Sequence, residues 1–152
     1  MADVMRYRRG PKVEIKIEKR SATDAVQIGD FVKYVSNEGV KTGASADSTS
    51  LLGVSMRASP TTDAAGTKLV LYQAGHGTVF EFTVPAKDTR AVGDCFVINN
   101  DAQQLLKKTV VNLNLTATNV VAVCVEANAV SSSSVVAQLL PSVLQVRAMP
   151  RG

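Results

Sequence analysis

The stretch that most restricts the fold is LLGVSMRASPTTDAAGTKLVLYQAGHGTVFEFTVP, which spans residues 51–85 and predicts three strands. The first strand, Leu51–Met56, contains Gly53, whose missing side chain lets a neighbouring strand approach closely. Lys68–Gln73 and Thr78–Val84 alternate between apolar and polar residues, which is typical of half-buried strands because successive side chains point to opposite faces. We therefore expect this stretch to form the centre of a small β-barrel or sandwich.

The triplet Gly75-His76-Gly77 lies between the second and third of these strands. Glycine on both sides of His76 allows the positive φ of a tight turn, so the triplet predicts a hairpin tip. A catalytic reading would need an orienting partner and a nucleophile for His76, and the sequence supplies neither. The expectation is that the protein is not an enzyme and has no catalytic residues.

The composition limits the class of protein further. The chain has 152 residues, 45% hydrophobic and 20% charged, which fits one globular domain whose valine and threonine favour strands. The predicted fold class is all-β, with a single small β-barrel or β-sandwich-like domain. No apolar run reaches the roughly 20 residues needed to span a bilayer, and the N-terminus lacks the apolar core of a secretory signal. The protein is expected to be made and used without crossing a membrane.

Cys95 and Cys124 are the two cysteines, and both lie in apolar, strand-like runs. Two buried, reduced thiols are the favoured interpretation, and a disulfide between neighbouring strands is the alternative. His76 is the one histidine, and no CxxC pair exists, so no metal site is expected. No cofactor is expected either, because no phosphate-binding glycine loop, dinucleotide fingerprint or calcium loop is present.

The positive charge is concentrated at the N-terminus. Residues 1–20 hold seven basic and three acidic side chains, which accounts for the whole net charge of +4. We divide the chain into an extended basic arm with an edge strand, residues 1–20, and a β-barrel-like domain, residues 21–152. Its first part, Met1–Lys12, is expected to be extended and mobile in the isolated chain, because Gly10-Pro11 breaks any helix there.

Within the arm, Val13–Lys19 is the clearest short alternation in the protein. Val13, Ile15 and Ile17 face one way, and the polar face carries both signs of charge, as an exposed edge strand does. The apolar face must pack on this domain or on a neighbouring subunit, and we favour a neighbouring subunit.

The remaining strands are expected at the segments between turn signals. Residues 28–35, 40–42, 93–99, 103–111, 119–127, 135–140 and 143–148 predict strands, with a short helical turn as the alternative for 103–111. Residues 86–92 and 131–134 predict a connector and a turn. A weak internal repeat is also present: Ile28–Val32 reads IGDFV and Val92–Phe96 reads VGDCF, each followed by a turn and an apolar strand. Two similar β-units, or coincidence of common turn chemistry, explain it equally well.

The arm admits three interpretations. It neutralises phosphates of a nucleic acid, it docks along another protein and orders on binding, or it is a solvated tail. The attached Val13–Lys19 strand favours the second, because strand addition is a common mode of protein recognition. The predicted contact residues are Arg6, Tyr7, Arg8, Arg9, Lys12, Val13, Ile15 and Ile17.

Residues 27–85 resemble the small β-rich decoration, or cement, proteins of tailed-bacteriophage capsids. The resemblance is carried by Gly29-Asp30-Phe31-Val32, Gly39-Val40-Lys41, Leu51-Leu52-Gly53-Val54 and Gly77-Thr78-Val79-Phe80-Glu81-Phe82, with Val92-Gly93-Asp94 in the same style. It implies a β-tulip-like protein that binds the outside of an icosahedral head, commonly as trimers, with terminal arms that span capsomer joints.

The prediction from sequence is therefore a structural virion protein that binds the outer surface of a phage capsid and stabilises it. The expected partners are the major capsid protein and further copies of the chain in a homotrimer, with neither membrane nor nucleic acid. The expected location is the outer capsid surface, after synthesis in the host cytoplasm. The alternatives are a nucleic-acid-binding β-barrel that uses the basic arm, or another phage structural subunit of the tail tube, the head-completion complex or the capsid shell.

Overall fold

The structure is a computed structural model that describes residues 5–41, 50–98, 105–108 and 120–140, without the side chains of 85–88, 105–108 and 128–132. The described residues are all-β, as predicted, and they contain no helix. The strands of the first half are β1 (Arg6–Arg9), β2 (Glu14–Lys19), β3 (Phe31–Val35), β4 (Glu38–Lys41), β5 (Leu51–Ser55) and β6 (Lys68–Gln73). Those of the second half are β7 (Val79–Arg90), β8 (Cys95–Ile98), β9 (Leu105–Lys108), β10 (Ala122–Cys124) and β11 (Asn128–Leu139).

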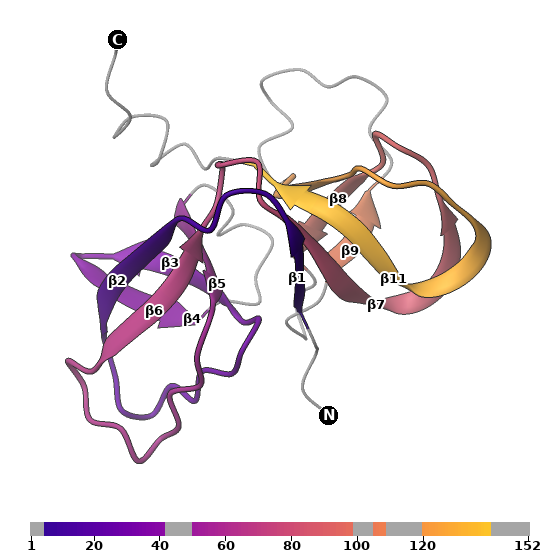
Figure 1. Cartoon of the computed structure of the whole chain (residues 1–152). Coiled ribbons are helices and arrows are strands. Elements are labelled where there is room, and N and C mark those ends of the chain that lie inside the picture. Colours follow the sequence, from indigo (N-terminus) through magenta and orange to yellow (C-terminus); the bar gives the residue numbers. More distant parts are fainter. Residues whose placement is uncertain (1–4, 42–49, 99–104, 109–119, 141–152) are drawn as a thin grey trace, which may run out of the picture.

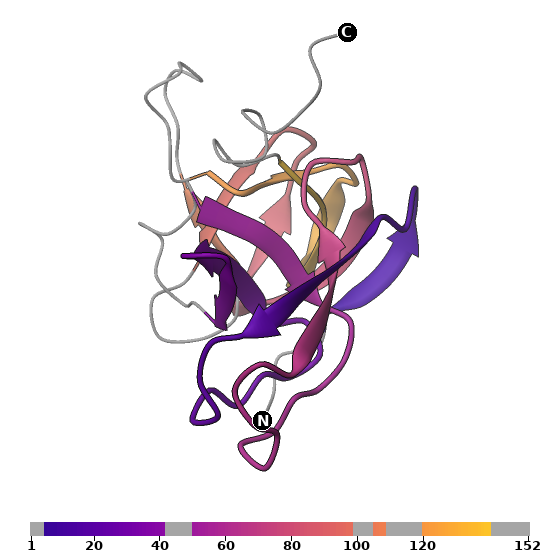
Figure 2. The same cartoon turned by 90° about the vertical axis from the view of Figure 1, so that its left-hand side faces the viewer.

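The strands form two units that lie side by side (Figure 1). The first unit is a closed barrel with the strand order β2-β4-β3-β5-β6. The second unit is a six-stranded sheet with the order β1-β7-β11-β10-β8-β9, so the first strand of the chain belongs to the second unit. In Figure 2 the barrel lies in front of the sheet, and the segment between β1 and β2 connects the two.

The second unit repeats the first strand by strand. The order β4-β3-β5-β6-β2 in the barrel corresponds to β9-β8-β10-β11-β7 in the sheet. The register corresponds too: Val54 pairs with Tyr72 as Val123 pairs with Gln138, and Ile15 pairs with Leu71 as Phe80 pairs with Ala137. Coincidence of turn chemistry does not produce matching order and register over five strands, so the interpretation of the IGDFV and VGDCF segments as two similar units is confirmed.

The repeated turns explain why these two sequence segments look alike. Gly29 and Gly93 have φ of 91° and 97°, the left-handed region that glycine occupies without strain. The Asp30 carboxylate accepts from Gln27 N at 2.7 Å, and the Asp94 carboxylate accepts from Ala91 N at 2.9 Å. Each aspartate therefore holds its own turn, as its position after glycine predicts.

The chain crosses between the units twice, and the two crossings touch. One crossing runs from β1 to β2 through Gly10, and the other runs from β6 to β7 through Gly75–Gly77. A Cβ built on Gly10 would lie 2.8 Å from Gly77 O, so only glycine allows this approach. The Thr78 hydroxyl donates to Pro11 O across the same contact. The prediction of a hairpin tip at His76 is wrong, because β6 and β7 belong to different units and do not pair with each other.

A shared core joins the units. Its buried residues come mainly from the second unit, and the first unit adds Phe31, Leu51, Val54 and Ala74. The rings of Phe31 and Phe82 stack across the junction with centroids 5.9 Å apart. A smaller second cluster fills the barrel itself: Val26, Val32, Leu52, Leu69 and Leu71, with Ile15, Ile17 and Tyr34 packed against it.

Several boundaries differ from those predicted. The division of the chain after residue 20 does not separate an arm from a domain, because β2 pairs with both β6 and β4 and closes the barrel. Residues 5–9 are not a mobile tail, since β1 pairs with β7 of the same chain. β7 continues through the expected connector to Arg90, and β11 includes the expected turn at residues 131–134. β10 is shorter than the strand predicted at 119–127, and the strand predicted at 143–148 lies outside the described residues.

Deleting residues 1–20 should abolish folding of the remaining chain, because the deletion removes β1 and opens the barrel at β2. Deleting residues 1–9 should leave a folded protein that is about 2–4 kcal/mol less stable, through loss of the buried Met5 and of the Tyr7 ring contacts. Circular dichroism with thermal melting checks both. A fragment 21–152 that melts cooperatively at the full-length temperature would contradict the assignment of β2 to the barrel.

Replacing Gly10 by alanine should cost about 2–4 kcal/mol, from its positive φ and from the clash with Gly77 O. Gly66 is the matched control, because its φ is +90° and no atom lies within 4 Å of a built Cβ. Gly66→Ala should therefore cost only about 1–2 kcal/mol. Denaturant unfolding of both variants measures the difference, and equal losses would show that the contact between the two crossings carries no energy.

Candidate interaction surface

Strand β1 lies beside β7 as an edge strand of the second unit, on the side nearer the barrel in Figure 1. Arg6 pairs with Glu81, Tyr7 with Phe80 and Arg9 with Val79, and a bulge separates the last two pairs. The side chains of Arg6, Arg8 and Arg9 are exposed, whereas Tyr7 is half-buried. The structure therefore brings the four predicted contact residues of β1 together on an ordered strand.

Two of these arginines already have acidic partners in the same chain. Arg9 Nη1 lies 2.8 Å from Glu126 Oε2, and Arg6 Nη1 lies 4.0 Å from Glu81 Oε1. Both arginines are exposed and the Arg6–Glu81 pair is long, so each pair contributes about 1 kcal/mol or less to stability. They nevertheless reduce the positive charge that β1 can offer to a partner.

Tyr7 attaches β1 to both units. Its ring stacks on Tyr72 of β6 with centroids 6.1 Å apart, and it meets the edge of Phe80 of β7 at 6.4 Å. Its hydroxyl donates to Gly10 O at 2.6 Å. Lys12 Nζ lies 4.4 Å from the centre of the same ring, which is a cation–π contact. Tyr7 and Lys12 thus stabilise the junction between the units.

The apolar side of β2 packs inside this chain. Ile15 and Ile17 contact the barrel cluster, and Val13 is half-buried at the start of the strand. The alternation allowed this face to pack either on the chain's own domain or on a neighbouring subunit. Ile15 and Ile17 pack on the chain's own domain, so the expectation of burial against a neighbouring subunit is wrong for them. The cause is that β2 is part of the barrel wall, paired with β6 and β4, and its odd-numbered side chains are the less exposed ones on the face toward the barrel cluster.

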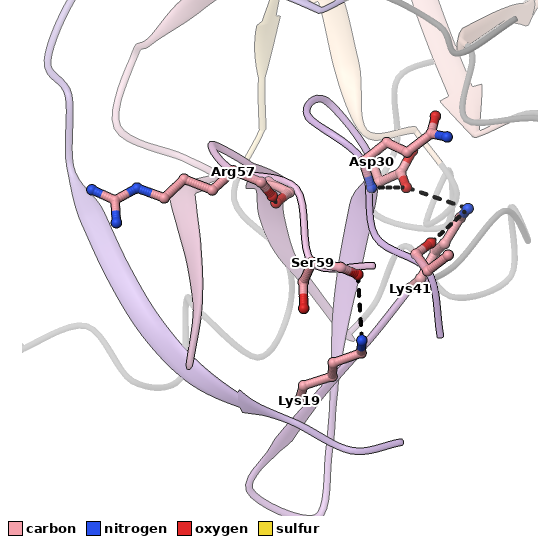
Figure 3. Close-up of polar contacts among 8 residues, drawn as sticks. Lys19, Asp30, Lys41, Arg57 and Ser59 are labelled. Atoms are coloured by element: carbon pink, nitrogen blue, oxygen red, sulfur yellow. Dashed lines mark hydrogen bonds and ion pairs between the residues drawn. The ribbon is translucent and has the colours of Figure 1, made fainter. Parts of the chain in front are cut away.

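Lys19, at the end of β2, is the largest fully buried side chain of the described residues. Its Nζ donates to Ser59 O at 3.3 Å and to Pro60 O at 3.0 Å, and Figure 3 shows the bond to Ser59. Both carbonyls also accept backbone bonds, from Val26 N and Asp63 N. Lys19 therefore ties the loop after β5 to the end of β2, and it offers no charge to a partner.

A second buried polar contact holds the turn before β3. Asp30 is 4% exposed, and its carboxylate lies 3.3 Å from Lys41 Nζ, as drawn in Figure 3. Lys41 also donates to Ala25 O at 3.2 Å. Strand β4 is joined in this way to the loop that enters β3. Asp30 and Asp94 thus have structural roles in the two repeated turns.

The two thiols are free and buried, as expected. Burial is the main cause that raises the pKa of Cys95, and the nearby Asp94 charge adds to it. Burial also raises the pKa of Cys124, against the lowering effect of its bond to Glu126 O. Both remain neutral, poorly nucleophilic thiols at physiological pH.

Among the described residues no group of three or more histidine, cysteine, aspartate or glutamate side chains is placed to hold a metal ion. That same part of the chain has no helix long and apolar enough to cross a membrane. Two residues that sequence reasoning did not single out are exposed and apolar: Ile28 is 53% exposed and Val92 66% exposed. They occupy equivalent positions, each just before the glycine of the repeated turn, so each unit presents one aliphatic tip.

No protein-family model matches the chain, and no curated protein is similar to it in sequence.

Replacing Lys19 by methionine should change the free energy of unfolding by about 1 kcal/mol or less, because methionine fills a similar volume and both carbonyls keep their backbone donors. Lys19→Glu places an unpaired negative charge against two carbonyl oxygens and should cost about 3–5 kcal/mol. Urea unfolding of the two variants gives the comparison. Equal destabilisation would mean that the ammonium group itself is needed to close the barrel end.

Proposed function

We propose that this protein is a non-enzymatic structural protein that binds the outer surface of an icosahedral phage capsid and stabilises it. The observation that carries the proposal is β1, a basic strand held in place on the outside of a body whose two units share one core. A preordered strand binds a partner with less loss of conformational freedom than a mobile arm does. The resemblance of residues 27–85 to capsid decoration proteins points in the same direction.

Arg8 is the basic residue of β1 that is best suited to contact the shell. Its side chain is exposed, and among the described residues it forms no ion pair. The aliphatic tips Ile28 and Val92 add apolar surface, one from each unit. Protein–protein interfaces combine an apolar centre with a polar rim, so exposed aliphatic residues and an exposed arginine both suit one.

Stabilisation of the shell follows from mass action, because a ligand that binds only the assembled state shifts the equilibrium toward that state. A homotrimer would place three copies of each contact on the lattice. Linked contacts raise apparent affinity by about 10²–10⁴ through effective concentration, so individually weak contacts suffice.

The competing function is nucleic-acid binding by exposed basic residues. Phosphate binding weakens steeply with salt, in proportion to the number of phosphates that the protein neutralises. A filter-binding series at increasing salt separates the two functions, because tight and steeply salt-dependent DNA binding by the purified chain would favour the nucleic-acid function.

Purified protein should bind saturably to capsids that lack it, taken from the phage that encodes the chain, and should raise their thermal disassembly temperature. Arg8→Glu should weaken binding about 5- to 10-fold, because it reverses an exposed interface charge without disturbing the core. Arg20→Glu is the matched control: it makes the same charge change on an exposed residue at the far end of β2 and should bind like the wild type. Co-sedimentation measures the affinities. Failure of the wild-type protein to bind capsids would exclude the proposed function.

A further inference from the structure

The repeat identifies a strand edge in the barrel that corresponds to the edge that β1 covers in the second unit. β1 pairs with Val79, Phe80 and Glu81 of β7. On their other side these three residues pair with Gln138, Ala137 and Val136 of β11. In the barrel, Glu14, Ile15 and Lys16 of β2 pair with the equivalent residues of β6, which are Tyr72, Leu71 and Val70. The β2 edge at residues 14–16 is therefore the counterpart of the β7 edge under β1.

The direction of the backbone groups on β2 follows from the bonds at its two ends. Val13 O accepts from Gln73 N at 2.8 Å, and Lys19 N donates to Thr67 O at 2.8 Å. The backbone N–H and C=O groups of the odd-numbered residues of β2 therefore point toward β6. Those of Glu14 and Lys16 point away from β6, to the outer side of the strand. On that side the pairing with β4 begins only at Glu18. Within the described ranges, the outer backbone groups of Glu14 and Lys16 have no strand partner.

We propose that this outer edge of β2 is a docking site for an extended segment of the partner protein, which adds to it antiparallel, as β1 adds to β7. The inference rests on the proposed function, in which the segment belongs to the capsid shell. Backbone hydrogen bonds supply the attachment, and the side chains opposite Glu14 and Lys16 supply the selectivity.

The charges of β2 define the chemistry of the segment. Glu14 and Lys16 are exposed and of opposite sign, so a matching strand carries a basic residue opposite Glu14 and an acidic residue opposite Lys16. Alternating edge charges also protect a strand from indiscriminate pairing, which explains how this edge can stay open without causing aggregation. A second copy of β1 in its usual register does not fit, because its Arg6, which pairs with Glu81 on β7, would oppose Lys16.

Lys16→Pro tests the edge directly. It removes an N–H that points away from β6, and proline is tolerated on edge strands for that reason. Lys16→Glu keeps the backbone donor and reverses the selective charge. Lys68→Glu is the matched control, since it makes the same charge change on an exposed residue of the neighbouring strand.

We expect Lys16→Pro and Lys16→Glu to fold and each to bind capsids about tenfold more weakly than the wild type, with Lys68→Glu unchanged. Amide hydrogen exchange at Glu14 and Lys16 should slow when the wild-type protein is bound to capsids. The contrary result is that the wild type binds capsids, both Lys16 variants bind as tightly as the wild type, and the exchange at residues 14 and 16 does not change. That result would show that the assignment of the docking site is wrong, while the proposed function stands.

A peptide probe tests the β2 edge without capsids. The docking proposal can therefore be tested even if the protein does not bind capsids. The probe is a synthetic peptide of residues 5–10 with the change R6E, which places glutamate opposite Lys16, arginine opposite Glu14 and tyrosine opposite Ile15. At millimolar concentration it should shift the NMR signals of Glu14–Lys16 in the full-length protein and leave those of Lys16→Pro unshifted, and the unchanged peptide should bind more weakly. Absence of any shift with the R6E peptide would overturn the proposal.

Discussion

The arrangement of the two units depends on the close contact between the two places where the chain crosses from one unit to the other. Gly10 approaches Gly77 so closely that a Cβ at position 10 would clash with Gly77 O, and the Thr78 hydroxyl donates to Pro11 O in the same place. Two adjacent crossings fix both the distance and the rotation between the units, which a single connection would leave free. The stacked rings of Tyr7 and Tyr72 then cover the crossing and extend the shared core to it.

The two units share the same strand order, but their strands differ in length. In the barrel, β2 ends after six residues, and the buried Lys19 holds the following loops. In the second unit the equivalent strands β7 and β11 run on for twelve residues each, paired as far as Arg90 and Asn128. The second unit also shares its main core with residues of the first, such as Phe31. The barrel in addition has a cluster of its own, built around Val32, Leu69 and Leu71.

Local patterns predicted the strands well and their partners poorly. The alternation of Val13–Lys19 identified β2 because side-chain burial is a local property of a strand, but its parallel pairing with β4 depends on residues that are distant in sequence. The same limit applies to Arg9 and Glu126, which are 117 positions apart and form an ion pair. At Gly75–Gly77 the glycines correctly predicted positive φ, yet a hairpin and a crossing between units need the same backbone chemistry. Lys19 escaped prediction because lysine is almost never fully buried.

The distribution of positive charge after folding bears on the choice of partner. The sequence suggests a continuous basic leader, but folding pairs Arg6 and Arg9 with glutamates, buries Lys19 and places Lys12 over an aromatic ring. The exposed cations that remain in that segment are separated: Arg8 lies on β1, Lys16 lies on β2, and Arg20 follows the end of β2. A nucleic acid gains affinity from many phosphates neutralised together, which separated cations do not provide. An ordered strand edge with a set pattern of charge suits the protein partner that we propose, because strand addition draws its affinity from fixed backbone geometry.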